Sequence, residues 1–255
     1  MHTMTDIDSL LSTFAPISLE QMGSVKLMNR TDTKFVTNTC QLEKLLTMAQ
    51  QDYYVQDIDG GRNLEYDTTY FDTSSFDMYL QHQHGHTNRQ KMRFRTYVSS
   101  GLQFMEVKTK NNHGRTKKKR IEVGDMDLGD TLKRDFLSKH LRYDADSLLP
   151  ALNNHFSRIT LVNRAKTERL TIDSTLRFNN LQNGESMDME SLVIIELKRD
   201  GLVPSPVLEM LRRLRIQPHG FSKYCMGSAL TGGSQLPVNR FKRNLIEIEK
   251  LVRRR

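Results

Sequence analysis

The stretch KMRFRTY, residues 91–97, alternates between long cations and other side chains. In a β-strand, successive side chains point to opposite faces of the sheet. One face therefore carries Lys91, Arg93 and Arg95, and the other carries Met92 and Phe94. We expect the apolar face to pack against a core. The cationic face raises the question of whether it meets bulk water or an anionic ligand.

Similar alternation recurs along the chain and predicts a mainly antiparallel sheet. Strands are expected over residues 30–36, 64–72, 89–98, 102–110, 116–123, 157–166, 168–173 and 192–199. The links SSG and NNHGR have hairpin length. Helical spacing is expected after Thr39, over 131–152 with a stop near Pro150, from Pro206 and from Ser222. The chain is therefore predicted to be α+β, with helices attached to a central antiparallel sheet.

Long cations and a few carboxylates share one face of several predicted strands. For any single strand, a solvated outer face explains such charges equally well. The stretch LVIIELKR, residues 192–199, favours a different interpretation, because this apolar strand would bury Glu196 and Lys198. Buried charges are costly unless they pair or bind something. A closed antiparallel barrel lined with charge satisfies this requirement, since its lumen can hold a polyanion with metal ions.

The composition is consistent with an anionic ligand. The 255 residues carry a formal net charge of +8, with a sequence pI near 9.5. This balance suggests nucleic acid, an acidic membrane surface or a phosphate-rich small molecule. The absence of tryptophan and an aromatic content of 7% argue against nucleic acid, because few rings are available for base stacking.

The location of the protein is predicted from features that the sequence lacks. Cys40 and Cys225 show no metal spacing and no disulfide framework, which indicates reduced thiols. We see no signal peptide and no run long enough to span a membrane. A cytoplasmic protein is therefore expected.

A charged lumen of this kind suits a triphosphate. Arginine and lysine neutralise phosphoryl oxygens, and carboxylates hold the Mg²⁺ or Mn²⁺ that bridges them. Phosphoryl transfer needs little beyond positioning and charge stabilisation. The sequence contains no GxxxxGK[ST] phosphate loop, so a P-loop enzyme is excluded.

Several motifs, in order, resemble a known family. They are NRTDTKFV, YDTTYFDT, RQKMRFRTY, FMEVKTK, IIELKRD and FSKYCMG. Together they resemble the VTC domain, the catalytic domain of the vacuolar transporter chaperone polyphosphate polymerase, within the triphosphate tunnel metalloenzyme (CYTH-like) superfamily. The resemblance extends from about residue 15 to 250. It implies a basic β-tunnel that uses Mn²⁺ or Mg²⁺ to transfer the γ-phosphate of ATP onto a polyphosphate chain.

The resemblance also implies roles for individual residues. Those implied as catalytic are Lys34, Arg93, Arg95, Lys108 and Lys198. Those implied as phosphate or substrate contacts are Arg120, with Lys119 as its alternative in register, and Arg164, Arg169, Ser222 and Lys223. Glu196 is implied as the principal metal ligand, and Glu106 and Asp32 are further candidate ligands.

Two departures from the family pattern bear on function. Arg30 stands where tunnel triphosphatases carry an acid of their ExExK motif, which argues against plain triphosphatase chemistry. Asn163 stands where an aromatic side chain is expected, which weakens the nucleotide contact there. The remaining alternatives are a tunnel triphosphatase or polyphosphatase, and a non-catalytic polyphosphate-binding module of a membrane-associated assembly.

The chain is expected to be a stand-alone, bacterial member of the family that can associate with a membrane through a protein partner. The tunnel domain is expected over residues 29–235, after a helical lead-in at 1–28 and before an amphipathic helix at 236–255 packed on the same domain. The alternating His82, His84 and His86 suggest either a metal site or a polar loop, and their Gly and Asn neighbours favour the loop.

Overall fold

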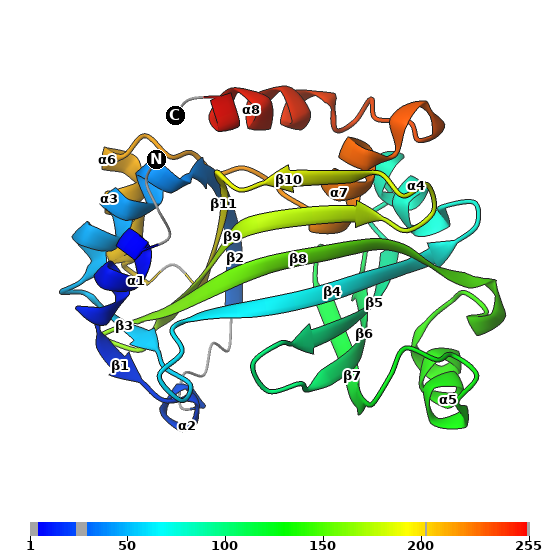
Figure 1. The fold of residues 1–255 in the computed structure, drawn as a ribbon, viewed down its shortest axis with the longest axis horizontal. Helices are drawn as coiled ribbons and strands as arrows, with labels where there is room; N and C mark the ends of the chain where they lie inside the picture. Colours follow the sequence, from blue (N-terminus) through cyan, green and yellow to red (C-terminus); the bar gives the residue numbers. More distant parts are fainter. Residues whose placement is uncertain (1–4, 24–29, 202, 254–255) are drawn as a thin grey trace.

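The structure is a computed structural model that describes residues 5–23, 30–201 and 203–253. Within these residues, 11 strands form one sheet and α-helices lie around it (Figure 1). None of the helices in these ranges is long and apolar enough to cross a membrane.

The main path of the sheet contains eight strands, each antiparallel to its neighbours. In spatial order they are β2 (Arg30–Asn38), β11 (Leu192–Asp200), β9 (Glu168–Asn180), β8 (Leu148–Asn163), β4 (Asn63–Thr73), β5 (Arg89–Tyr97), β6 (Gln103–Lys110) and β7 (Thr116–Val123). Off this path lie the short strands β1 (Ala15–Ile17), β3 (Tyr53–Gln56) and β10 (Ser186–Met189). The predicted antiparallel α+β fold is confirmed.

The predicted closure of the barrel needs a correction. In the described residues, no ladder joins the two end strands of the path, β2 and β7, so the sheet curls strongly without closing. The sequence of β7, TKKKRIEV, offers a physical reason. Lysines on an edge strand disfavour pairing with another strand, because pairing would crowd and desolvate their charges.

The helices gather in groups around the sheet (Figure 1). They are α1 (Thr5–Ser12), α2 (Leu19–Met22), α3 (Thr39–Ala49), α4 (Asp77–Gln83), α5 (Thr131–His140), α6 (Pro206–Arg213), α7 (Lys223–Thr231) and α8 (Lys242–Arg253). Single 3₁₀ turns occur at Ala145–Ser147 and Gly233–Gln235. The predicted helix starts at Pro206 and near Ser222 are confirmed.

Alternate side chains in the second half of β11 face opposite sides of the sheet, one side apolar and the other charged. Val193, Ile195 and Leu197 are buried in one cluster with side chains of α1, α3 and α6. Their neighbours Glu196 and Lys198 point to the other side, because adjacent strand residues alternate. Helix packing against the apolar side therefore turns the charged side inward. We call this concave side the inner face.

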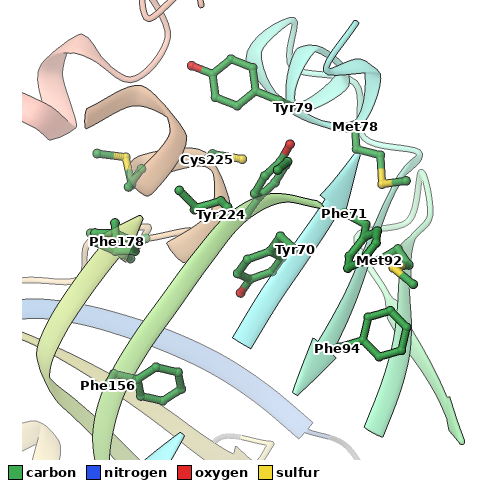
Figure 2. Close-up of a cluster of buried hydrophobic side chains, with 14 of the residues drawn as sticks. Tyr70, Phe71, Met78, Tyr79, Met92, Phe94, Phe156, Phe178, Tyr224 and Cys225 are labelled. Atoms are coloured by element: carbon green, nitrogen blue, oxygen red, sulfur yellow. The ribbon is translucent and has the colours of Figure 1, made fainter. Parts of the chain in front are cut away.

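A second cluster joins strands from both halves of the sheet, including Ile194 of β11, to α4, α5, α7 and α8. Figure 2 shows Phe71, Met92 and Phe94 close together on β4 and β5, and Tyr70 lying toward Tyr224 of α7. The rings of Tyr70 and Tyr224 stack with centroids 5.2 Å apart. These contacts hold the start of α7 against the sheet.

The expected helix over residues 131–152 is wrong beyond His140. The chain passes through the first 3₁₀ turn and enters β8 at Leu148, so Pro150 lies inside a strand. Pro150 pairs with Phe71 where the register between β4 and β8 shifts. Proline is tolerated in a sheet at such a bulge, because the ladder is locally interrupted there. The expected loop over the three histidines is confirmed for His84 and His86, which follow the last residue of α4, and is wrong for His82, which belongs to that helix.

Candidate functional site

The register of β5 and β6 places their charged side chains together on the inner face. Arg93 lies opposite Glu106, and Lys91 lies opposite Lys108. Residues directly opposite in an antiparallel pair project to the same side. The charge of Glu196 acts to raise the pKa of Lys108, although several strands separate β11 from β6 in the order of the sheet. The curl of the sheet therefore brings its two halves toward each other around these residues.

Glu106 is a buried acid of the inner face, with 1% of the residue exposed. Arg93 Nε donates to its Oε2 at 2.7 Å, and Lys118 Nζ lies 2.8 Å from its Oε1. Burial alone would raise the pKa of the Glu106 carboxyl, but Arg93, Arg95 and Lys118 outweigh it and hold that pKa well below its usual range. Glu106 is therefore ionised and already neutralised by cations.

Arg95 and Lys108 lie where positive charge is in excess. Arg95 is 8% exposed, donates from Nε to Thr68 Oγ1 at 3.3 Å, and lies 5.6 Å from the ring centroid of Tyr66. Burial and the charges of Arg93 and other cations lower the pKa of Arg95 to about 10. Arg93, together with burial, holds the pKa of Lys108 well below its usual value. A bound anion would relieve this repulsion.

A second ion-pair cluster joins β8, β9 and α7. Arg158 donates from Nε to Asp173 Oδ1 at 2.6 Å and from a terminal nitrogen to Oδ2 at 2.8 Å. Lys223 Nζ lies 2.8 Å from the same Oδ2. Burial alone would raise the pKa of Asp173, but Arg158 and Lys223 hold it well below its usual range. One acid thus serves two cations.

Arg158 is a residue of this cluster that is not among the predicted site residues. The sequence nevertheless contains a signal for Arg158. It lies inside the strand expected over 157–166, at an even number of residues from Arg164, so the two side chains are expected on the same face of that strand. Its guanidinium lies 5.2 Å from the centroid of Tyr66 and 5.3 Å from that of Phe156. Arg158 therefore belongs to the inner face.

Glu196 and Lys34 lie opposite each other on β11 and β2, and Lys198 lies opposite Asp32. Lys198 Nζ is 2.8 Å from Glu196 Oε2. Burial would raise the pKa of Glu196, but Lys198, Lys34 and Lys108 together lower it to about 2. The ionised Glu196 side chain keeps 23% of its surface exposed, whereas that of Glu106 keeps 1%. Glu196 is thus the more accessible of these two acids.

Ser222 and Lys223 begin α7 beside these strands. The Ser222 hydroxyl caps the helix by accepting from the N–H of Cys225 at 3.2 Å, and it also accepts from Lys91 Nζ at 2.6 Å. The next residue, Tyr224, donates its hydroxyl proton to Asp72. Asp72 additionally accepts the backbone N–H groups of Thr73, Met78 and Tyr79. The start of α7 is therefore fixed to the ends of β4 and α4.

The remaining predicted site residues divide into two groups. Arg120 lies opposite Glu106 on the inner face, and Arg169 lies opposite Lys198. Lys119 lies opposite Val107 and so projects to the convex side. Arg164 lies on the turn after β8, where its guanidinium covers the ring of Tyr54 at 4.1 Å. The structure does not bring Lys119 or Arg164 to the cluster around Glu106.

The three predicted metal ligands do not form a preassembled site. Among the described residues, no group of three or more His, Cys, Asp or Glu side chains is placed to hold a metal ion. Glu106 is occupied by Arg93 and Lys118. Glu196 and Asp32 are diagonal neighbours on β11 and β2. Carboxylates are the protein ligands that Mg²⁺ prefers, and Mg²⁺ commonly takes its other ligands from phosphate oxygens and water, so the chemistry of these two side chains is compatible with such an ion.

The three histidines are also not gathered around a common point. His82 Nδ1 lies 2.8 Å from the sulfur of Cys225, and its Nε2 lies 3.2 Å from Arg89. Burial and the neighbouring cations, Lys91 foremost, lower the pKa of His82 to about 2. His84 and His86 are exposed. His82 is therefore a neutral side chain packed beside α7.

Comparison with known proteins now identifies the family. The sequence profile of the VTC domain matches residues 29–231. The chain belongs to the VTC domain family. No curated protein sequence matches it significantly.

Two solved structures are similar to this VTC domain. A candidate adenylate cyclase from Bacillus halodurans aligns with a TM-score of 0.50 and 15% identity, over 76% of this chain and 96% of that protein. A protein from Hippeastrum, described as having a dominant triphosphatase activity, aligns with a TM-score of 0.48 and 13% identity, over 83% and 99%. The likeness to the Bacillus halodurans protein shows that the VTC domain shares its fold.

Proposed function

We propose that the inner face binds the triphosphate of ATP and transfers its γ-phosphoryl group onto a polyphosphate chain. The observation that carries this proposal is the excess of buried cations over acids. Glu106 and Asp173 are each engaged by two cations, while burial and the charge of Arg93 lower the pKa values of both Arg95 and Lys108. A polyanion supplies the missing negative charge.

The roles of the residues follow from their placement. Arg93, Arg95, Lys108 and Lys34 would neutralise the oxygens of the triphosphate, and Lys223 with Ser222 would hold phosphate at the start of α7. Mn²⁺ or Mg²⁺ would arrive as part of the nucleotide substrate, where Glu196 and Asp32 would hold it and its charge would offset that of the phosphoryl oxygens. Lys198, now paired with Glu196, would remain beside both.

In the proposed reaction, a terminal oxygen of the polyphosphate chain attacks the γ-phosphorus of ATP. The bond between that phosphorus and the bridging oxygen breaks, and ADP leaves. The attacking oxygen is already an anion, so the step requires no general base. This agrees with the inner face, since Glu106, Asp173 and Glu196 all have lowered pKa values and are weak bases. The expected protein partner at a membrane stays a prediction.

The experiment is to incubate the purified protein with ATP and Mn²⁺ and to resolve the products on a gel that separates polyphosphate chains. We expect a ladder of polymer that Glu196→Gln abolishes while ATP binding persists, because the cations remain. Glu65→Gln is the matched control. Glu65 is an exposed carboxylate on β4, and its side chain projects to the side of the sheet opposite to the inner face.

The other outcomes assign the alternatives. Release of free phosphate without polymer would indicate that the protein is a triphosphatase or polyphosphatase. Tight polyphosphate binding without any turnover would favour the non-catalytic module. Polymer synthesis that survives Glu196→Gln would contradict the role given to Glu196.

A further inference from the structure

The edge strand β7 divides its run of cations between the two sides of the sheet. Lys118 and Arg120 lie opposite Lys108 and Glu106 and belong to the inner face. Lys117 and Lys119 lie opposite Thr109 and Val107, and therefore project to the convex side. Only the first pair therefore shares a side with the proposed triphosphate site.

On the convex side, a pocket of about 330 Å³ lies between β5–β7 and the end of α5. Its cations are Lys117, Lys119, Lys139 and Arg142, and we call it the outer basic pocket. None of the residues that line it, all within the described part of the chain, is a carboxylate. No ion pair is formed by Lys117, Lys119 or Lys139 within that part. The charges of these three lysines are therefore not neutralised by a carboxylate of the described fold.

The walls of the outer basic pocket are held in place by Gln90, which is 5% exposed. Its Nε2 donates to Thr109 Oγ1 at 2.9 Å and to the carbonyl oxygen of His140 at 2.8 Å. Its Oε1 accepts the backbone N–H of Arg142 at 2.9 Å. One buried amide thus fixes the end of α5 against the sheet, so the cations from the two elements face a common, preformed space.

We propose that the outer basic pocket is a second binding site for polyphosphate, occupied by the part of a long chain that extends past the inner face and across the edge of β7. This inference rests on the proposed function. In the described residues β7 pairs only with β6, so no further strand separates Lys118 and Arg120 from Lys117 and Lys119. A linear polyanion can therefore contact both pairs in succession.

Nucleic acid and anionic lipid also present phosphates, but the pocket favours polyphosphate. Its lining includes no Phe, Tyr or Trp among the described residues, so it offers no platform of those rings for stacking bases. Its cations also continue the series on the inner face, alternating along one strand. We therefore expect chain length to decide whether the site is used.

The test compares the affinities of the full-length protein for tripolyphosphate and for a long-chain polyphosphate. In the variant Lys117→Ala/Lys119→Ala/Lys139→Ala, we expect affinity for the long chain to fall about tenfold, since three exposed charge contacts are lost. Affinity for tripolyphosphate should stay within about twofold. The matched control Lys44→Ala/Lys242→Ala/Lys250→Ala removes the same charge from exposed positions on α3 and α8, and should leave the ratio of the two affinities unchanged.

An equal loss for both ligands, or no loss for either, would overturn the site. Single-stranded DNA that binds as tightly as the long polyphosphate, through the same three lysines, would overturn the ligand class. These readouts do not depend on turnover. A protein that makes no polymer from ATP would contradict the proposed function, whereas an affinity ratio that the triple variant leaves untouched would contradict the outer basic pocket alone.

Discussion

Asp173 is the residue on which the ion pairs of β8, β9 and α7 depend. In Asp173→Asn, Arg158 and Lys223 would stay buried without their shared counter-charge, with side chains 17% and 10% exposed. We expect a loss of about 3–5 kcal/mol in the free energy of unfolding, measured with urea. The control Asp188→Asn breaks a pair that is about half exposed and should cost under about 1 kcal/mol. Similar small losses in both variants would show that Asp173 is not a structural counter-ion.

Lys108 should behave in the opposite way, because its charge is unfavourable in the free protein. Its pKa is lowered in the folded state, so the unfolded state binds the proton more tightly and folding is penalised at neutral pH. Lys108→Met should therefore raise the free energy of unfolding at pH 7. The gain should shrink as the pH rises toward the ordinary lysine pKa of about 10.5, where the unfolded state also loses the proton. A destabilised Lys108→Met at pH 7 would contradict this assignment.

For single residues, the sequence alone was enough to place a side chain wherever the alternation along a strand decides which face it occupies. Arg93, Arg95, Lys108, Glu196 and Lys198 could be placed on one face by counting in steps of two, and the register agrees. Alternation alone could not decide whether Lys119 or Arg120 projects to the inner face, because that depends on the pairing of their strand with β6. It also could not show that Arg158 and Lys223 share Asp173, because that contact joins α7 to β8 and β9.

Among the elements, β8 illustrates what a local pattern misses. Its first half contains Pro150, Asn153, Asn154 and His155, which resemble a helix end and a loop rather than a strand. The strand forms because both its edges are paired, by β4 and by β9, and because the bulge at Pro150 absorbs the missing N–H. Long-range pairing of this kind leaves no local signal in the sequence.

The position of α7 depends on close contact at Gly227. A Cβ at this residue would lie 2.5 Å from a ring carbon of Phe178 and 2.6 Å from a methyl of Leu152, both buried in the core. Gly227→Ala should therefore push α7 outward and cost about 1–3 kcal/mol in unfolding free energy. It should also weaken tripolyphosphate binding, because α7 carries Lys223.

Gly220→Ala is the control for this change, since a Cβ at Gly220 would meet no atom within 4 Å. We expect a change within about 0.5 kcal/mol for it. If Gly227→Ala matched Gly220→Ala in stability and in binding, then close packing of α7 would not position Lys223.

Considered as a whole, the molecule holds positive charge on a curled inner face. The charge of Arg93 together with burial lowers the pKa of Lys108, and burial is the main cause that lowers the pKa values of Lys198 and Lys223. A bound polyanion should raise those pKa values, so binding should take up protons and affinity should fall as the pH rises above about 8. Calorimetry in two buffers of different ionisation enthalpy measures this uptake. Net proton release at that pH would contradict the proposed electrostatics.

The central claim is that the triphosphate binds the inner face and not the convex side of the same strands. Lys108 on β6 and Lys119 on β7 test it directly, because these two lysines lie on adjacent strands and project to opposite sides. The measurement is the calorimetric affinity for tripolyphosphate of Lys108→Met and of Lys119→Met. The account predicts a loss of about tenfold or more for Lys108→Met, since a charge contact with phosphate away from bulk water is removed, and a change within about twofold for Lys119→Met. Equal losses, or a greater loss for Lys119→Met, would place the phosphate elsewhere and contradict the account.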